Sequence, residues 1–302
     1  MKPLLIIGGA TGSGKSDIAV ACAKILDGEV ISCDSMQIYR GLDVGTAKIR
    51  KEEMQGIPHH MIDIVEPTES FTAADYKEKA SKIIEAVSSR GKIPILCGGT
   101  GLYINAVLYD LSFSGEFDPA LRASLQKEAE EKGKEYMHQK LAELDPAAAA
   151  RLHVNDEKRV IRAIEKALTG GEKENDFSQA KYPYRIFVTD LPRDILYDRI
   201  NRRVDKMMDV GLKEEVLTLL NTGVGFDKQC MQAIAYKEWA GFLSGEMTEK
   251  EVVELIKKNT RNYAKRQVTW FKQYKDARLL NVIDHPLEEI AKEVCVRYNE
   301  EV

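Results

Sequence analysis

A glycine-rich segment near the N-terminus has the residue types and spacing that bind phosphate groups. Residues 9–16 match the pattern G-x-x-x-x-G-K-[ST], which is the pattern of a P-loop. The apolar run 4–7 before it predicts a buried strand, and the run 17–26 after it predicts a helix. All four fixed positions and both flanks agree, so a chance glycine turn is a poor alternative. The residues expected to hold a diphosphate or triphosphate are Gly9, Ala10, Thr11, Gly12, Ser13, Gly14, Lys15 and Ser16.

The chemistry of this loop follows from its backbone and two side chains. Glycines let successive N–H groups turn inward around phosphate oxygens, and the helix N-terminus adds its dipole. Lys15 would reach the outer phosphate. Ser16 would offer its hydroxyl to Mg²⁺, which is the cofactor we expect.

Two further loops follow predicted parallel strands and should lie beside the P-loop. Asp34 comes directly after the run 29–33, where a carboxylate faces the ligand crevice; a plain helix cap is the alternative. Residues 98–101, Gly-Gly-Thr-Gly, follow the run 93–97. P-loop ATPases often carry an acidic metal ligand in this place. Flexible backbone with the Thr100 hydroxyl suits close approach of a substrate, or is only a tight turn.

Other chemistry-bearing residues point to structural roles. His59 and His60 are adjacent in a predicted strand, so they face opposite sides, and no cysteines lie at zinc-ligand spacing. The five cysteines are scattered, which favours buried free thiols. Thr72 and Asp75 have the spacing of a helix capping box.

The middle of the chain predicts a helical insertion over residues 116–182. The runs 118–132, 133–144 and 155–168 have helical patterns, and strand signals resume at 184–189. In the last run, Arg159, Arg162 and Lys166 form one basic stripe. The opposite, apolar face holds Ile161, Ile164 and Leu168. An RNA surface and a solvated helix face would have the same pattern.

A second basic stripe is predicted on a long helix over 248–274. Four cations fall within about 80° of each other, and they are Lys257, Arg261, Lys265 and Lys272. Tyr263, Trp270 and Tyr274 lie on the opposite side, where aromatics would pack on a core. The stripe indicates contact with a polyanion. Helices are also expected over 193–220 and from Gln232 to Gly245.

Composition bounds these readings. The chain has 302 residues, 44% hydrophobic residues and a net charge of −4, so any nucleic-acid site must be a local basic patch. No apolar run approaches the ~20 residues of a membrane helix, and no signal peptide is visible at the start. We therefore expect a cytoplasmic protein with no membrane partner.

The predicted architecture is an α/β, P-loop NTPase-like parallel sheet flanked by helices. Residues 1–115 and 183–302 would form the core around the all-helical insertion. A small-molecule kinase would use the loop for ATP. A GTPase or motor ATPase would need a metal-binding acid that is not evident. A group transferase with a diphosphate leaving group would need a polyanion surface if its acceptor were RNA, and the two basic stripes favour it.

The chain resembles the bacterial tRNA dimethylallyltransferases (tRNA isopentenyltransferases) over nearly its whole length. The resemblance rests on the segments 9–16, 34–48, 58–64, 98–103, 232–238 and 260–267. The segment 34–48, Asp-Ser-Met-Gln-Ile-Tyr-Arg-Gly-Leu-Asp-Val-Gly-Thr-Ala-Lys, is highly specific. The chain departs from the family at Ala10, where Pro is frequent, and at Ala235, where Gly is usual.

The resemblance implies a reaction. A dimethylallyl group would pass from dimethylallyl diphosphate to the exocyclic N6 amine of the adenosine just 3′ of the tRNA anticodon. Asp34 would accept a proton from that amine, and Thr100 would line the base site. Lys15 would neutralise the leaving diphosphate, Thr11 would lie at its bridging oxygen, and Arg203 would add a cation, with Arg199 as its rival.

The resemblance also implies that a monomer contacts the anticodon stem-loop of tRNA, partly through the insertion. The implied tRNA-binding residues are Asp34, Ser35, Met36, Gln37, Thr100, Arg122, Lys158, Arg159, Val160, Ile161, Arg162, Gln232, Lys237, Arg261 and Lys265. Transfer to free AMP, a small-molecule kinase and an RNA-binding P-loop protein without turnover stay open as alternatives.

Overall fold

The computed structural model describes residues 2–113, 118–170 and 176–300. It divides the chain into two compact units, Met1–Asp110 with Gln179–Val302, and Leu111–Ser178. The sequence places the limits of the insertion at 116 and 182. Residue 116 lies outside the described residues. Residues 181 and 182 belong to the first unit, because the Lys181 N–H donates to the Leu108 carbonyl and Tyr182 is buried in the core.

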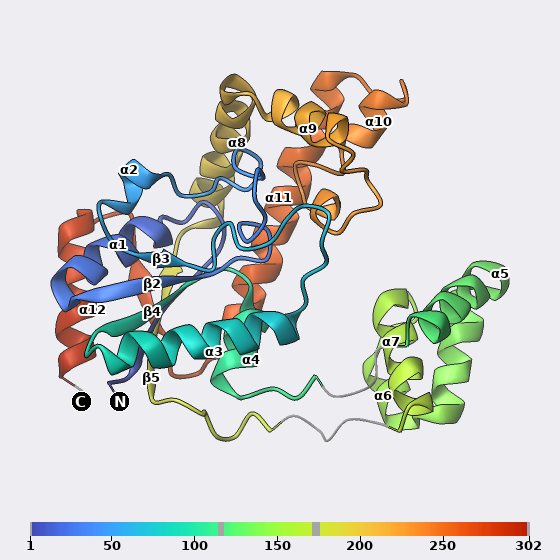
Figure 1. Ribbon diagram of the computed structural model, residues 1–302, viewed down its shortest axis with the longest axis horizontal. Coiled ribbons are helices and arrows are strands. Elements are labelled where there is room, and N and C mark those ends of the chain that lie inside the picture. The colour runs from blue at the N-terminus through green and yellow to red at the C-terminus, as the bar shows by residue number, and fades with distance from the viewer. Residues whose placement is uncertain (1, 114–117, 171–175, 301–302) are drawn as a thin grey trace. The chain divides into compact units, whose positions relative to one another are not determined.

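The first unit is built on a six-stranded parallel sheet with the order β3-β2-β4-β1-β5-β6 (Figure 1). The strands are β1 (Leu4–Gly8), β2 (Gly28–Cys33), β3 (His59–His60), β4 (Ile93–Gly98), β5 (Tyr184–Asp190) and β6 (Arg278–Asn281). This confirms the predicted parallel α/β fold.

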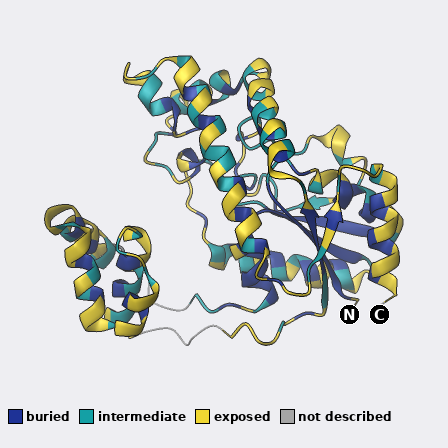
Figure 2. Cartoon of the chain, turned by 180° about the vertical axis from the view of Figure 1, so that it is seen from behind, coloured by how far each residue is buried: buried dark blue, intermediate teal, exposed yellow. Residues whose placement is uncertain are grey.

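Helices cover both faces of the sheet, because successive side chains of a strand point to opposite faces. Leu5 and Ile7 of β1 pack on α1 (Lys15–Leu26) and α12 (Leu287–Asn299). Leu4 and Ile6 pack on the side of α3 (Ala73–Ser89) and α4 (Gly101–Leu108). The strands β1, β2 and β4 are therefore fully buried between two helical layers (Figure 2).

Strand register brings the predicted site loops together. Gly8, the last residue of β1, pairs with Gly98 of β4, and Gly98 pairs with Cys33 at the end of β2. The segments that follow these three strands are the P-loop, the loop that begins at Asp34 and the glycine loop at 98–101. They leave the same edge of the sheet side by side, where open α/β sheets bind ligands.

The first unit has further helices besides those that cover the sheet. They are α2 (Lys51–Met54), α8 (Arg193–Val210), α9 (Leu212–Asn221), α10 (Trp239–Leu243) and α11 (Glu249–Phe271). The capping box of Thr72 and Asp75 at the start of α3 is confirmed, and Thr248 with Glu251 forms another at α11.

The helix predicted from Gln232 is wrong. A short 3₁₀ turn covers Cys230–Gln232, turns follow, and α10 begins only at Trp239. Ala235 has φ of 80°, which an α-helix does not allow, and its N–H donates to the Glu238 carboxylate. Glycine adopts a positive φ without strain, so this backbone conformation suits glycine better than alanine.

The second unit consists of α5 (Pro119–Leu144), α6 (Pro146–Arg151) and α7 (Glu157–Leu168). The backbone of α5 is non-helical at Gly133, which confirms the predicted break between two helical runs. Ile161 and Ile164 are buried in the cluster shared by these helices, but Leu168 is 47% exposed. The predicted apolar face is therefore wrong at its last position.

One carboxylate connects the two halves of α5 across this break. Glu128 accepts hydrogen bonds from Lys140 at 2.5 Å and from Lys132 at 3.1 Å. The Lys140 hydrogen bond is the main cause that lowers the pKa of Glu128 from 4.5 to about 2. A depressed carboxylate pKa stabilises the folded state above pH 4.5 and loses that contribution as the pH falls toward 2.

We expect the α5 amides to lose hydrogen-exchange protection between pH 4.5 and 2.5, after correction for intrinsic exchange rates, and Glu128→Gln to reduce this loss. The variant has no carboxyl group to protonate, so it lacks this contribution at every pH. Parallel loss of protection in both proteins would contradict this role of Glu128.

Candidate active site

The P-loop connects β1 to α1 and leaves backbone donors directed at one cavity. Gly14 has φ of 86°, a left-handed conformation that glycine adopts readily, and it is the N-cap of α1. The Ile18 N–H makes the first helical bond, to the Gly14 carbonyl. The N–H groups of Lys15, Ser16 and Asp17 therefore have no intrahelical acceptor and suit an anion.

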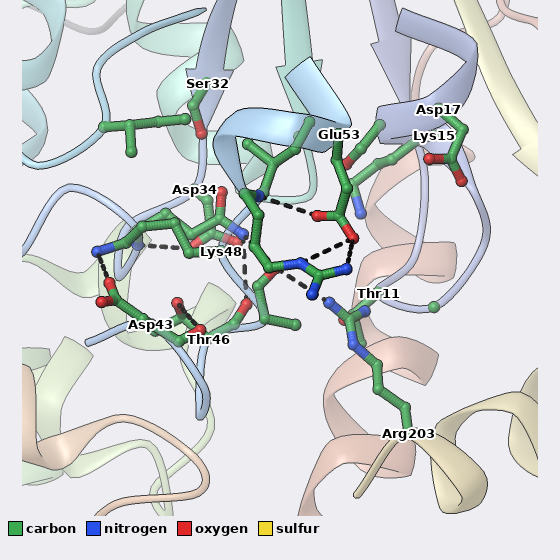
Figure 3. A pocket seen from close by; sticks show the side chains of 18 of the residues that line it. Thr11, Lys15, Asp17, Ser32, Asp34, Asp43, Thr46, Lys48, Glu53 and Arg203 are labelled. Carbon is green, nitrogen blue, oxygen red and sulfur yellow. Dashed lines mark hydrogen bonds and ion pairs between the residues drawn. The ribbon is translucent and has the colours of Figure 1, made fainter. Parts of the chain in front are cut away.

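Two cations and a hydroxyl lie at this loop: Lys15 and the Thr11 hydroxyl belong to it, and Arg203 approaches it (Figure 3). The Lys15 ammonium donates to the Ala10 carbonyl at 3.2 Å, and burial lowers the pKa of Lys15. Arg203, on α8, donates to the Thr11 hydroxyl at 3.2 Å and to the Ala47 carbonyl at 3.4 Å. Burial lowers the pKa of Arg203, and the carboxylates of Asp34, Asp17 and Glu53 oppose that shift. An arginine stays protonated in such a place.

Asp34 lies at the start of the loop that follows β2. Its Oδ1 accepts the N–H of Met36 at 2.8 Å and the N–H of Gln37 at 3.3 Å. The capping alternative is therefore correct for this oxygen, although the cap starts a turn and not a helix. The same bonds fix the orientation of the carboxylate, whose charge acts on both Lys15 and Arg203.

Thr100 joins the glycine loop to the Asp34 loop. Its hydroxyl accepts the Ser35 N–H at 3.2 Å, and its own N–H donates to the Cys33 carbonyl at 3.0 Å. Tyr263 of α11 interacts through its hydroxyl with Thr100, and burial raises the pKa of Tyr263 to about 12. Tyr263 therefore belongs to the site, whereas the sequence analysis assigned it only to core packing.

A cavity of about 570 Å³ collects most of the predicted donor-site residues. It lies within the first unit, and its volume is typical of a small-ligand site. The predicted residues that line it are Thr11, Gly12, Gly14, Lys15, Ser16, Asp34, Gln37, Arg199 and Arg203. Ser35, Met36 and Thr100 are not part of this lining. Ser35 and Met36 follow Asp34 in the chain, and Thr100 accepts the Ser35 N–H.

A carboxylate that the sequence analysis missed holds the 43–48 segment of the cavity wall. The Glu215 carboxylate on α9 accepts the N–H groups of Asp43, Val44 and Gly45 at 2.7 to 3.0 Å. It also accepts the Tyr236 hydroxyl at 2.6 Å. No sequence signal marks Glu215, because its partners in the cavity wall are about 170 residues away in the chain.

Lys48 is a second missed anchor of this wall. Its buried ammonium donates to the Tyr39 carbonyl and to the carboxylates of Asp43 and Asp63 at 2.5 to 2.7 Å. Gln37 ties the same segment to the Asp34 loop, since its side-chain amide donates to the Thr46 and Ala47 carbonyls. The segment that carried the resemblance is therefore a fixed wall of the cavity.

The predicted basic stripe of α11 is only partly exposed. Lys257 is 14% exposed and pairs with Asp205 at 2.6 Å and Glu254 at 3.1 Å, so its predicted outward position is wrong. Arg261 is partly buried and donates to Asn201 at 2.5 Å. Lys265 and Lys272 are exposed as predicted. A helical pattern alone does not show which cations form ion pairs with acidic residues of a neighbouring helix.

Of the residues of the second unit that were predicted to contact tRNA, some lie in its core and others on its surface. Val160 and Ile161 are buried in the helical cluster of this unit, so their side chains do not lie on its surface. Arg122 and Arg162 both bind the buried carboxylate of Glu165, at 2.5 and 2.9 Å, and remain partly exposed.

The other predicted RNA contacts in both units lie on the surface. Lys158 and Arg159 are exposed, and Arg159 also pairs with Asp156. Gln232 and Lys237 of the first unit are exposed as well.

The histidines and cysteines have structural surroundings, and neither a metal-binding group nor a membrane-spanning helix is found among the described residues. The His59 ring contacts the Ile57 carbonyl, and His60 contacts Glu29. All five cysteines are buried and free, as predicted. Among the described residues, no three histidine, cysteine or acidic side chains are grouped to bind a metal. No helix in the described part of the chain is long and apolar enough to cross a bilayer.

Comparison with known proteins gives the family. Residues 37–274 match the model of IPP transferase. The chain belongs to the IPP transferase family. The tRNA dimethylallyltransferase of Caldanaerobacter subterraneus subsp. tengcongensis is 46% identical, with 98% of this chain and 96% of that protein covered. The tRNA dimethylallyltransferase of Bacillus anthracis is 47% identical, with 94% and 92% covered.

Solved structures agree with this membership of the IPP transferase family. The tRNA isopentenylpyrophosphate transferase of Bacillus halodurans has a TM-score of 0.76 and 41% identity, and the match covers 100% of this chain and 98% of that one. A eukaryotic dimethylallyltransferase described as acting on tRNA has a TM-score of 0.78 and 28% identity, over 94% of this chain and 75% of that one.

Proposed function

We propose that this protein is a tRNA dimethylallyltransferase. It would transfer the dimethylallyl group of dimethylallyl diphosphate to the N6 amine of the adenosine 3′-adjacent to the anticodon and release diphosphate. The observation that carries the proposal is that the P-loop and the Asp34 carboxylate line one cavity. Family membership and the names of the full-length relatives support the same activity.

The donor side of the cavity suits a diphosphate leaving group. When the bond between the allylic carbon and the bridging oxygen breaks, negative charge develops on the diphosphate. Lys15 and Arg203 would neutralise it, and the Thr11 hydroxyl, already held by Arg203, would lie at the bridging oxygen. These groups are fixed before the reaction, so little reorganisation accompanies the charge development.

Magnesium fits the donor set of this site. Ser16 would supply one hard oxygen ligand at the first turn of α1, and diphosphate oxygens and water would supply the others. The ion would act as a Lewis acid on the leaving group.

The acceptor side uses Asp34. The lone pair of an exocyclic adenine amine is delocalised into the ring, so the amine is a weak nucleophile. As the new carbon–nitrogen bond forms, Oδ2 of Asp34 would take the proton that the amine loses. Oδ1 already holds the Met36 and Gln37 N–H groups, which orient the other oxygen. The target base must leave its stack to reach this carboxylate.

The RNA would contact exposed cations on each unit. Lys265 and Lys272 on α11, and Lys158 and Arg159 on α7, are exposed. Phosphate contacts around a splayed loop are the usual way in which proteins bind single-stranded RNA segments. We propose that the protein acts as a monomer in the cytoplasm.

Transfer of labelled dimethylallyl diphosphate to an unmodified anticodon stem-loop, with Mg²⁺ present, tests the proposal. We expect label in the stem-loop and none in AMP supplied in parallel. Label only in AMP would assign the protein to nucleotide substrates. If neither acceptor is labelled and ATP is turned over, the proposal is wrong and the protein is a kinase.

Lys265→Ala should weaken stem-loop binding and make its salt dependence less steep. Removal of one phosphate contact lowers the slope of log K against log salt concentration by about one. Lys257→Ala is the control on the same helix, because Lys257 is paired with Asp205 and Glu254. Binding titrations at several salt concentrations measure both slopes. Equal slopes for Lys265→Ala and the parent protein would place this cation away from the RNA.

A further inference from the structure

One glutamine of α11 connects the two loops that the proposed reaction brings together. The side-chain oxygen of Gln267 accepts the Thr11 N–H of the P-loop at 2.9 Å. Its side-chain nitrogen donates to the Gly99 carbonyl of the glycine loop at 3.1 Å. Gln267 is only 5% exposed, and its bond to Gly99 is buried.

The chemistry of these partners fixes the orientation of the amide. A backbone N–H can only donate and a carbonyl can only accept, so the amide oxygen must face Thr11 and the nitrogen must face Gly99. The Tyr263 hydroxyl interacts with the same amide from the preceding turn of α11. Gln267 is therefore held in one arrangement by groups from three segments.

Gln267 also approaches the glycine loop closely. A Cβ atom at Gly99 would lie 2.0 Å from the Gln267 side-chain nitrogen and 3.1 Å from the Gly9 carbonyl oxygen. A side chain at position 99 would therefore displace the Gln267 amide from the Gly99 carbonyl and crowd the Gly9 carbonyl of the P-loop. The missing side chain at Gly99 and the Gln267 amide therefore both affect the distance between the P-loop and the glycine loop.

Each of these loops carries a group with a role in the proposed reaction. On the donor side, the Thr11 backbone bound by Gln267 belongs to the residue whose hydroxyl faces Arg203. On the acceptor side, Gly99 precedes Thr100, whose hydroxyl holds the Ser35 N–H next to Asp34. The spacing between the leaving group and the nucleophile depends on the spacing between these loops.

From this geometry we infer that Gln267 is a positioning residue, which sets the distance between the diphosphate loop and the base site. The inference rests on the proposed function. Gln267 touches no reacting atom, so its loss leaves the charged groups that bind the donor in place. A small displacement of reacting groups lowers the rate of the chemical step more than it lowers binding.

The chain offers a matched control for the loss of this pair of bonds. Gln229 accepts the Phe71 N–H at 3.1 Å and donates to the Phe71 carbonyl at 2.8 Å. It makes the same two kinds of bond, but neither Gln229 nor Phe71 lines the cavity. Gln267→Met and Gln229→Met thus remove the same two kinds of hydrogen bond, one pair next to the P-loop and the other pair at an exposed residue away from the cavity.

We expect Gln267→Met to lower the single-turnover rate of transfer to the stem-loop about 10- to 100-fold. The KM for dimethylallyl diphosphate and the stem-loop affinity should change little. Gln229→Met should keep the parental rate. Equal rates for the two variants, or a change confined to KM, would overturn the inference. If the parent protein transfers nothing, the proposed function is wrong and the inference falls with it.

Gln267→Glu gives a second readout if Gln267→Met does not fold. A neutral carboxyl group can accept from Thr11 and donate to Gly99, whereas the carboxylate cannot donate. Burial favours the neutral form. The rate of Gln267→Glu relative to the parent should therefore rise as the pH is lowered from 8 to 6. A ratio that is flat or falls over this range would overturn the inference.

Discussion

Asp34→Asn should lower the rate of dimethylallyl transfer about 10²-fold or more, in the range that general-base catalysis contributes. The asparagine oxygen can still accept the Met36 and Gln37 N–H groups, so the turn keeps its geometry. The amide that replaces Oδ2 has no lone pair able to take a proton. Single-turnover measurement with labelled dimethylallyl diphosphate reports this loss directly.

Stem-loop affinity is the control for Asp34→Asn, because the substitution preserves the turn but removes the base. We expect affinity close to that of the parent protein. Asp34→Ala removes both the hydrogen-bond acceptor of the turn and the base. It should therefore lower stem-loop affinity as well as the transfer rate. A parental transfer rate in Asp34→Asn would show that another group takes the proton.

Arg203→Gln should lower the transfer rate about 10²- to 10³-fold, as is typical when one preorganised donor to a developing charge is removed. Arg203 donates to Thr11 (Figure 3), and the carboxylates of Asp34, Asp17 and Glu53 act on its charge. Loss of its charge leaves the leaving diphosphate with Lys15 alone among the cations bound to the P-loop that the structure describes.

Arg199→Gln is the matched control for this prediction. Arg199 lies one turn earlier on α8 and lines the same cavity, but the structure shows no hydrogen bond from it to the P-loop residues described. We expect its rate to stay near that of the parent protein. Steady-state kinetics on both variants separates the two arginines. A larger loss in Arg199→Gln would reverse their assignment.

The sequence predicts the parallel sheet and the P-loop because both depend on local signals. Apolar runs of strand length, the glycine spacing and the helix that follows are contiguous in the chain. The same local rules place Asp34 and Thr100 at the sheet edge, since each follows a strand. The prediction of Arg203 came from the family resemblance and not from helical periodicity.

The remaining features depend on contacts between distant segments. Glu215 and Gln267 act on loops about 170 to 256 residues away, and nothing in their sequence neighbourhoods marks those partners. Lys257 satisfies the pattern of an outward cation, but Asp205 of a neighbouring helix pairs with it. The resemblance implies that Val160 contacts RNA, yet the helical cluster of the second unit buries its side chain. Sequence periodicity identifies a helix face but not the element that covers it.

Simultaneous measurement of diphosphate release and label transfer to the anticodon stem-loop, in the absence of ATP, tests the central claim most directly. The claim is that the P-loop holds the diphosphate of the prenyl donor. We expect one diphosphate for each dimethylallyl group transferred, with both signals lost together in Arg203→Gln. Diphosphate release without transfer, or transfer that requires ATP hydrolysis, would contradict the account.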